Sequence, residues 1–215
     1  MYVIGVDLSG PSGTQNTDVA VFAVHDEKLR YLNNECDGSD VSLLGTVQEL
    51  SRAGTVVIGL DAPLSYEPGG GQRARDAELR KELVARGMRP GSIMAPTAPR
   101  MVYLTLRGLV LAQVLTGVSG DHPVRIAEVH PGGALCLRGA PLDAVRSFAK
   151  DGDARDILLD WMAGQSVTGV VRPSPCSSHF VAACAAALAA WDWHCGRSQW
   201  LAPAQLPWHP FDFAS

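Results

Sequence analysis

Residues 1–9, MYVIGVDLS, open the chain with an apolar run that is broken by Asp7. The run is rich in Val and Ile and hardly alternates between apolar and polar residues, which is typical of a strand buried on both faces. We therefore expect a central strand of a sheet that stops at Asp7. Two later apolar runs stop in the same way, residues 56–60 at Asp61 and residues 124–127 at Glu128.

The segments next to the first run predict an antiparallel meander. The turn at residues 10–13 is followed by residues 17–24 and 28–33, two further runs of strand-forming composition. Together with the first run they give three strands joined by short connections.

The next segments predict a helix followed by a strand that pairs in parallel, not antiparallel, with the first strand. Apolar residues recur at three-residue spacing over residues 41–53, Ser39 or Asp40 can cap the start, and Gly54 ends the pattern. This helix supplies the crossover that residues 55–60 need in order to pair in parallel with the first strand.

The rest of the chain predicts one more parallel strand and several helices. Residues 62–100 hold Pro- and Gly-rich loops around a basic helix, residues 72–86, and are interpreted as an insertion between core elements. We find no internal repeat or linker, so residues 1–215 are assigned to a single domain. Further helices are expected at residues 101–115, 142–149, 154–163 and 177–193, with an irregular tail at residues 196–215.

Composition and charge limit the classes of protein to consider. With 47% hydrophobic and 19% charged residues, the chain is typical of a compact globular protein. No stretch reaches the roughly 20 apolar residues of a membrane span, and the N-terminus lacks the pattern of a signal peptide, so we expect a cytoplasmic protein with no membrane partner. The net charge of −4 means that any contact with nucleic acid must come from a local patch. Without a C-x-x-C pair, the five cysteines are expected to be reduced structural thiols: Cys36, Cys136, Cys176, Cys184 and Cys195.

The three acids at strand ends indicate a site for a divalent cation. If the three strands are parallel neighbours, about 4.8 Å apart, the carboxylates emerge along the edge where open α/β sheets bind ligands. Such close carboxylates repel one another unless a cation neutralises them, and Mg²⁺ or Mn²⁺ prefers oxygen ligands. Two such ions, about 3.5–4 Å apart, can activate water and stabilise the leaving oxygen in phosphodiester hydrolysis. The alternative is that each acid only caps the turn or helix that follows it.

The sequence around the acids resembles a known family, the domain of unknown function 429 family, whose members are predicted nucleases with an RNase H-like fold. The pattern of Arg75, Asp76, Leu79 and Arg80, with residues 90–92 and 95–97 after it, also fits, and the resemblance extends from residue 2 to about residue 193. The three segments that carry it are Val3-Ile4-Gly5-Val6-Asp7-Leu8-Ser9-Gly10, Gly59-Leu60-Asp61-Ala62-Pro63-Leu64 and Ala127-Glu128-Val129-His130-Pro131.

The resemblance implies an α/β fold with a mixed five-stranded sheet of order 3-2-1-4-5, flanked by helices, with the helical insertion after strand 4. Asp7, Asp61 and Glu128 would then converge as catalytic metal ligands. In this fold a further acid usually stands on the last helix, where this chain has Ala182 and Ala183.

His179 is the substitute that we expect at this departure from the family pattern. It precedes Ala182 by three residues, which places it on nearly the same face of the helix, and an imidazole can bind a metal or transfer a proton. The alternative is that His179 only belongs to the start of the helix, beside a cap at Ser177 or Ser178. His130 is interpreted as the residue that starts the turn before Pro131, and the alternative is that it supports the metal site by contacting one of the metal ligands.

Basic residues are concentrated between positions 73 and 107, which hold eight of the eighteen Lys and Arg residues. Seven of the eight are Arg, which suits bidentate contact with phosphate. We expect them to form a basic wall beside the metal site, in which the substrate-binding residues are Arg73, Arg75, Arg80 and Arg100. The alternative is a solvated helix with internal ion pairs to Asp76, Glu78 and Glu82.

Three functions are consistent with these patterns. The first is a metal-dependent nuclease that uses Mg²⁺ or Mn²⁺ and binds nucleic acid. The second is a catalytically degenerate domain of the same fold that binds nucleic acid or a protein. The third is an actin-like nucleotide-dependent phosphotransferase, because residues 10–14, GPSGT, follow a strand and an Asp. The type of nucleic acid and the oligomeric state, a homodimer included, stay open.

Overall fold

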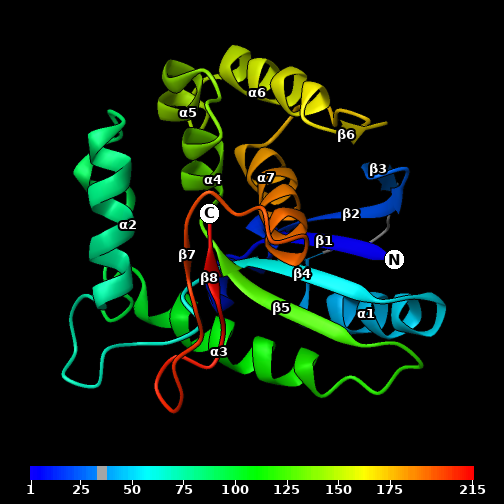
Figure 1. Cartoon of the computed structure of the whole chain (residues 1–215), viewed down its shortest axis with the longest axis horizontal. Coiled ribbons are helices and arrows are strands. Elements are labelled where there is room, and N and C mark those ends of the chain that lie inside the picture. Colours follow the sequence, from blue (N-terminus) through cyan, green and yellow to red (C-terminus); the bar gives the residue numbers. More distant parts are fainter. Residues whose placement is uncertain (33–37) are drawn as a thin grey trace.

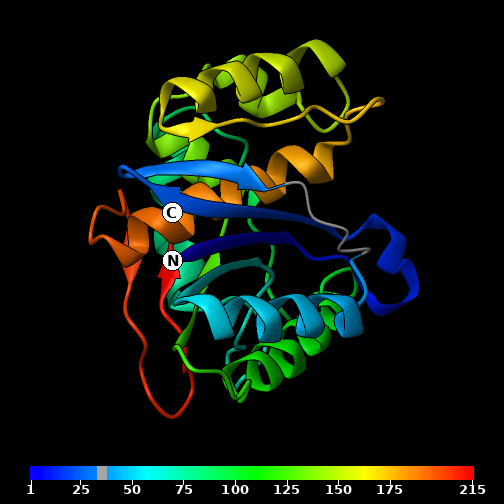
Figure 2. The same ribbon diagram turned by 90° about the vertical axis from the view of Figure 1, so that its right-hand side faces the viewer.

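The computed structural model describes residues 1–32 and 38–215, which form a mixed sheet with helices on both faces (Figures 1 and 2). The strand order is β6-β3-β2-β1-β4-β5-β8-β7. Pairing is antiparallel along β1, β2 and β3, and parallel along β1, β4 and β5. The strands are β1 (Tyr2–Asp7), β2 (Asp18–His25), β3 (Lys28–Leu32), β4 (Val56–Asp61), β5 (Val124–Val129), β6 (Val167–Thr168), β7 (Leu201–Ala202) and β8 (Phe213–Ala214).

The predicted α/β fold class and the core order 3-2-1-4-5 are confirmed, with the pairing directions of RNase H-like folds. The predicted helices are present with bounds that differ by a few residues. The α-helices are α1 (Asp40–Ala53), α2 (Ala74–Ala85), α3 (Val102–Thr116), α4 (Pro131–Leu137), α5 (Leu142–Ser147), α6 (Gly152–Gly164) and α7 (Ser178–His194), and two 3-10 helices are η1 (Pro11–Asn16) and η2 (Pro90–Ser92).

Both ends of the core sheet are extended. β6 pairs with β3, and the C-terminal tail, which was expected to be irregular, contributes β8 beside β5 and then β7. These strands have two residues each. Segments this short contain no periodic pattern, and their pairing depends on contacts that are distant in the sequence.

The two faces of the sheet are covered differently. α1 and α3 pack on one face, whereas α7 lies along the other, with α4, α5 and α6 beyond it (Figure 2). In the part of the chain that is described, no helix is long and apolar enough to cross a membrane. Four cysteines in that part are free thiols, as expected: Cys136, Cys176, Cys184 and Cys195. Cys36, and Asn33 at the end of the predicted third strand, lie outside the described residues.

Small residues let α7 approach the centre of the sheet closely. Gly5 of β1 and Gly59 of β4 are register partners beneath the alanines of this helix. A Cβ atom at Gly5 would overlap the carbonyl oxygen of Ala183, and one at Gly59 would lie 2.5 Å from that of Ala186. This backbone-to-backbone packing fixes the height of α7 above the strand ends, where the acids lie.

Candidate active site

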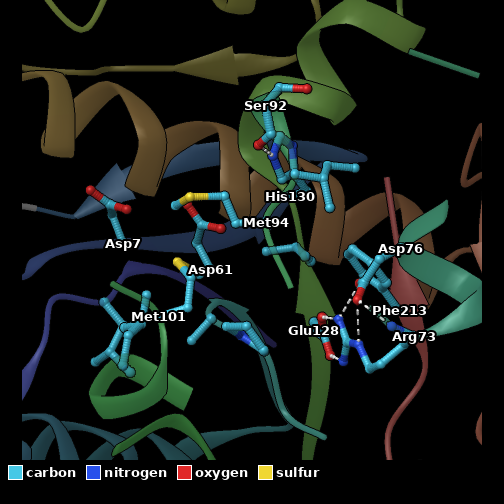
Figure 3. Close-up of a pocket in the computed structure, with 16 residues that line it drawn as sticks. Asp7, Asp61, Arg73, Asp76, Ser92, Met94, Met101, Glu128, His130 and Phe213 are labelled. Carbon is cyan, nitrogen blue, oxygen red and sulfur yellow. Dashed lines mark hydrogen bonds and ion pairs between the residues drawn. The ribbon is translucent and has the colours of Figure 1, made fainter. Parts of the chain in front are cut away.

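Asp7 and Asp61 lie side by side at the ends of two adjacent parallel strands. They are register partners in the β1–β4 pair, and both line a cleft of about 220 Å³ at this edge of the sheet (Figure 3). The sequence predicted this pair correctly, because both apolar runs end at the acid and parallel pairing brings the two ends together.

The electrostatics of this pair favour the binding of a proton or a cation. Burial raises the pKa of Asp61 well above its usual range, and the charge and side-chain interaction of Asp7 raise it further, with a smaller contribution from Glu128. The raised pKa means that the surroundings of Asp61 disfavour its charged form. A divalent cation between the two carboxylates would remove this electrostatic penalty.

His179, on the first turn of α7, interacts directly with Asp7. Its Nδ1 lies 2.6 Å from Oδ2 of Asp7. The hydrogen bond to Asp7 raises the pKa of His179, although burial opposes the shift. The cap of α7 is Ser177, whose hydroxyl accepts from the backbone N–H of Phe180, so His179 is not itself the cap. The structure therefore brings His179 to the acid pair, as its spacing from Ala182 suggested.

Glu128 was expected to end its strand beside Asp61, but β5 continues to Val129, Glu128 is in register with Leu60, and its side chain is bound to other partners. Its two carboxylate oxygens accept hydrogen bonds from Arg73 at 2.5 and 2.8 Å, and the backbone N–H of Leu64 donates to one of them at 3.0 Å. Figure 3 shows this cluster on the side of the cleft away from Asp7. Among the described residues, no group of three or more His, Cys, Asp or Glu side chains is placed to hold a metal ion. The role of Glu128 as a third ligand stays a prediction.

A protein-family model described as "Protein of unknown function (DUF429)" matches residues 5–206. The chain belongs to the DUF429 family. Neither the comparison with curated proteins nor that with solved structures gives a match.

Most of the arginines expected to bind substrate stabilise loops in this DUF429 protein. Arg73 is 1% exposed and is bonded to Glu128 and Asp76. Arg75 donates to backbone carbonyls of the C-terminal tail, and Arg80 donates to Gln72 and to the carbonyl of Ile93.

Arg100 is the one of the four predicted substrate-binding arginines whose side chain is exposed rather than bound within the loops. The substrate-binding prediction itself stays untested. The pair of Arg73 with Asp76 agrees with the alternative of internal ion pairs, whereas the bonds of Arg75 to the tail have no local signal because their acceptors are backbone carbonyls more than 100 residues away.

His130 was expected to start a turn before Pro131, but it starts a helix instead. It is the N-cap of α4, where Nδ1 accepts from the backbone N–H of Gly133, so Nε2 carries the hydrogen and donates to the carbonyl of Ser92 at 2.9 Å. Burial lowers the pKa of His130, which favours this neutral form. Because both ring nitrogens are used, His130 positions η2 against the cleft and is not free to act on a substrate.

Two further side chains belong to the site: Asp76, which the sequence offered as an ion-pair partner of the basic helix, and Ser92, which was missed. Asp76 pairs with Arg73 and completes a capping box at the start of α2. Ser92 lines the cleft, and its hydroxyl is buried without a hydrogen-bond partner among the described residues. A capping acid three residues into a helix is a readable signal for Asp76. Ser92 offered no such signal.

Asp61→Asn should increase the thermal stability of the metal-free protein at neutral pH. A carboxyl group whose pKa is raised by folding contributes stability that is complete below its unfolded pKa and is lost as the pH rises through its folded pKa. Asn removes this loss, and we expect the melting temperature at pH 7 in EDTA to rise by roughly 2–4 °C, or about 1 kcal/mol.

The pH dependence of this gain separates the electrostatic cause from others. At pH 4, where Asp61 is largely protonated, the gain should shrink towards zero. Asp121→Asn, at an exposed bend before β5, is the control for removal of a negative charge. An equal increase in melting temperature at both pH values, or a decrease at pH 7, would contradict the unfavourable charge assigned to Asp61.

Proposed function

We propose that this protein is a metal-dependent hydrolase of phosphodiester bonds in nucleic acid, with one Mg²⁺ or Mn²⁺ ion bound by Asp7 and Asp61. The observation that supports it is the register pairing of these two acids in an open cleft. Among the described residues, neither acid forms an ion pair with Lys or Arg, whereas Glu128 does. Mg²⁺ is commonly bound through one or two carboxylates, waters and a substrate phosphate, so the pair is sufficient.

The residues around the pair suit this chemistry. A bound ion would polarise the phosphoryl oxygen and lower the pKa of a bound water. His179 has its pKa raised by Asp7, so it holds a proton at a higher pH than a free imidazole and can donate it to a leaving oxygen. Asp7 orients this imidazole through the 2.6 Å contact. The exposed Arg100 is available to a phosphate of the polymer.

The direct test is a nuclease panel with and without Mg²⁺ or Mn²⁺. Wild type should cleave at least one of single-stranded RNA, single-stranded DNA, duplexes or bis(p-nitrophenyl) phosphate, and should lose activity in EDTA. Asp7→Asn removes a metal ligand and the partner of His179 together, so the rate should fall by about a hundredfold or more. Asp121→Asn should cleave as wild type does.

The rival functions give different outcomes in the same panel. Cleavage that persists in Asp7→Asn, or in EDTA, would show that the activity belongs to another site or to a contaminant. Binding of nucleic acid with no Mn²⁺ binding by calorimetry would favour the degenerate binding domain. ATP hydrolysis without phosphodiesterase activity would favour the phosphotransferase.

A further inference from the structure

A second hollow, of about 460 Å³, adjoins the cleft at Asp61. Three residues line both hollows, namely Asp61, Ser92 and His130. The second hollow extends from there between the loop before η2 and the start of α4, towards α5 and α7. Its volume lies within the range of about 300–1,000 Å³ that is typical of small-molecule sites.

The walls of this second hollow are mostly apolar. Ala182 of α7 belongs to them. A longer side chain at 182 would extend into the hollow beside Asp61, so alanine keeps this space open. The apolar side chains that line it are Met88, Pro131, Val145, Phe148, Ala149 and Ala182.

The polar groups of the hollow favour a ligand that carries negative charge. Arg89 and Arg146 line it, and both are exposed. Arg89 has no ion-pair partner in the described part of the chain, and the nearest acid oxygen to Arg146 is that of the exposed Asp143 at 4.0 Å. Arginine binds phosphate oxygens well, and these two are not committed to strong internal pairs.

Ser92 supplies an unsatisfied hydrogen-bonding group at the junction of the two hollows. Its hydroxyl is buried without a partner among the described residues. A buried polar group without a partner costs free energy, and a ligand that bonds to it removes that cost. An apolar wall, two exposed arginines without a close ion-pair partner among the described residues and one unsatisfied hydroxyl together resemble a formed binding site rather than a packing defect.

We propose that this hollow, the side pocket, binds the nucleoside next to the scissile phosphate. The base lies among the apolar residues, the following phosphate contacts Arg89 and Arg146, and the scissile phosphate lies at Asp7 and Asp61. A base paired within a duplex cannot enter such a pocket without leaving its stack. The substrate class is therefore unpaired nucleic acid: single strands, free ends or short oligonucleotides. The reaction rests on the function proposed above, whereas binding in the side pocket does not.

Binding without metal or turnover tests the side pocket separately from catalysis. Titration calorimetry in EDTA should detect adenosine 5′-monophosphate binding to wild type. Ribose 5-phosphate has the same charged group without a base and should bind at least tenfold more weakly. Arg146→Glu should weaken nucleotide binding at least tenfold. Arg52→Glu, an exposed charge reversal on α1 across the sheet, should bind as wild type does.

A second variant tests the apolar part. Ala182→Leu fills the side pocket and should abolish nucleotide binding. Since Ala182 is buried, a melting curve must first show that this variant folds, and Phe148→Ala, which removes the aromatic wall, replaces it if it does not. Three results would contradict the proposal that the side pocket binds a nucleotide. They are equal affinity for ribose 5-phosphate and the nucleotide, unchanged nucleotide affinity of Arg146→Glu, and no nucleotide binding to wild type at millimolar concentration.

The two proposals fail in different ways. If nucleotide binding depends on Arg146 but no phosphodiesterase activity is found, the proposal for the side pocket stands and the proposed function is wrong. If bis(p-nitrophenyl) phosphate is hydrolysed in a metal-dependent way but no nucleotide binds, the proposed function stands and the proposal for the side pocket is wrong. With both intact, single-stranded oligonucleotides should be cleaved at least tenfold faster than duplexes of the same sequence.

Discussion

Gly5→Ala is expected to prevent folding, or to destabilise the fold by more than about 4 kcal/mol, the range of exceptional single substitutions. The added Cβ would overlap the carbonyl oxygen of Ala183 and lie 2.3 Å from the backbone nitrogen of Ala187. Both obstacles are backbone atoms of α7, so no side-chain rotation relieves the overlap. The measurement is denaturant unfolding, with soluble yield as the readout if the variant does not accumulate.

Two further glycines calibrate this prediction. Gly59→Ala meets the carbonyl of Ala186 at 2.5 Å and should also be severely destabilising. Gly45→Ala is the matched control on an exposed position of α1, where a Cβ meets nothing within 4 Å, and it should stabilise by about 0.5–1 kcal/mol because alanine is the better helix former. If Gly5→Ala unfolds cooperatively within about 1 kcal/mol of wild type, α7 does not pack on the sheet as closely as described.

The same packing links the core to the candidate site. α7 carries both His179 and Ala182, so its height above β1 and β4 sets the contact of His179 with Asp7 and the opening of the side pocket beside Asp61. If Gly59→Ala folds at all, α7 should be displaced. The metal-dependent activity of the folded fraction should then be lower than that of wild type.

The sequence predicted the fold core because its signals are local. Apolar runs, a cap at Ser39 and a stop at Gly54 lie within or next to the elements that they define, and α1 begins within one residue of the predicted start. The acid pair followed from the same signals, since parallel pairing in register requires only that both strands end at the acid.

The remaining features of the site depend on contacts that no local pattern encodes. Glu128 was expected to end its strand as Asp7 and Asp61 do, yet β5 continues to Val129, and a guanidinium 55 residues away in the sequence binds both oxygens of Glu128. The two-residue strands of the tail and the buried arginines were missed for the same reason. Each is determined by a partner that becomes adjacent only after the chain has folded.

Arg73→Ala should destabilise the protein by about 3–5 kcal/mol, the cost of removing one partner of a buried ion pair. Arg73 is 1% exposed, and its guanidinium bonds Glu128, Asp76 and the hydroxyl of Ser65 at once. Burial alone would lower the pKa of Arg73, but the charges and hydrogen bonds of Glu128 and Asp76 raise it above its usual value. The variant would leave two buried carboxylates without a counter-charge.

Chemical denaturation of matched variants measures this cost. Arg73→Lys should recover little of the lost stability, because one ammonium group cannot bridge both acids as the planar guanidinium does. Arg86→Ala breaks the half-exposed pair with Glu82 and is the control, with an expected change of about 0–1 kcal/mol. A change of similar size in Arg73→Ala would show that the buried cluster does not stabilise the fold as its geometry indicates.

The partner variant Glu128→Gln decides between the two roles of this acid. If Glu128 serves to hold Arg73 and the N–H of Leu64, Glu128→Gln should lose stability while Mn²⁺ affinity, measured by calorimetry, stays within about threefold of wild type. A loss of affinity as large as that in Asp61→Asn would instead show that Glu128 leaves Arg73 to bind the ion. The site would then be a three-acid centre in its loaded state, and the Arg73 pair would be the form that the cluster adopts without metal, in which the arginine takes the place of the missing positive charge.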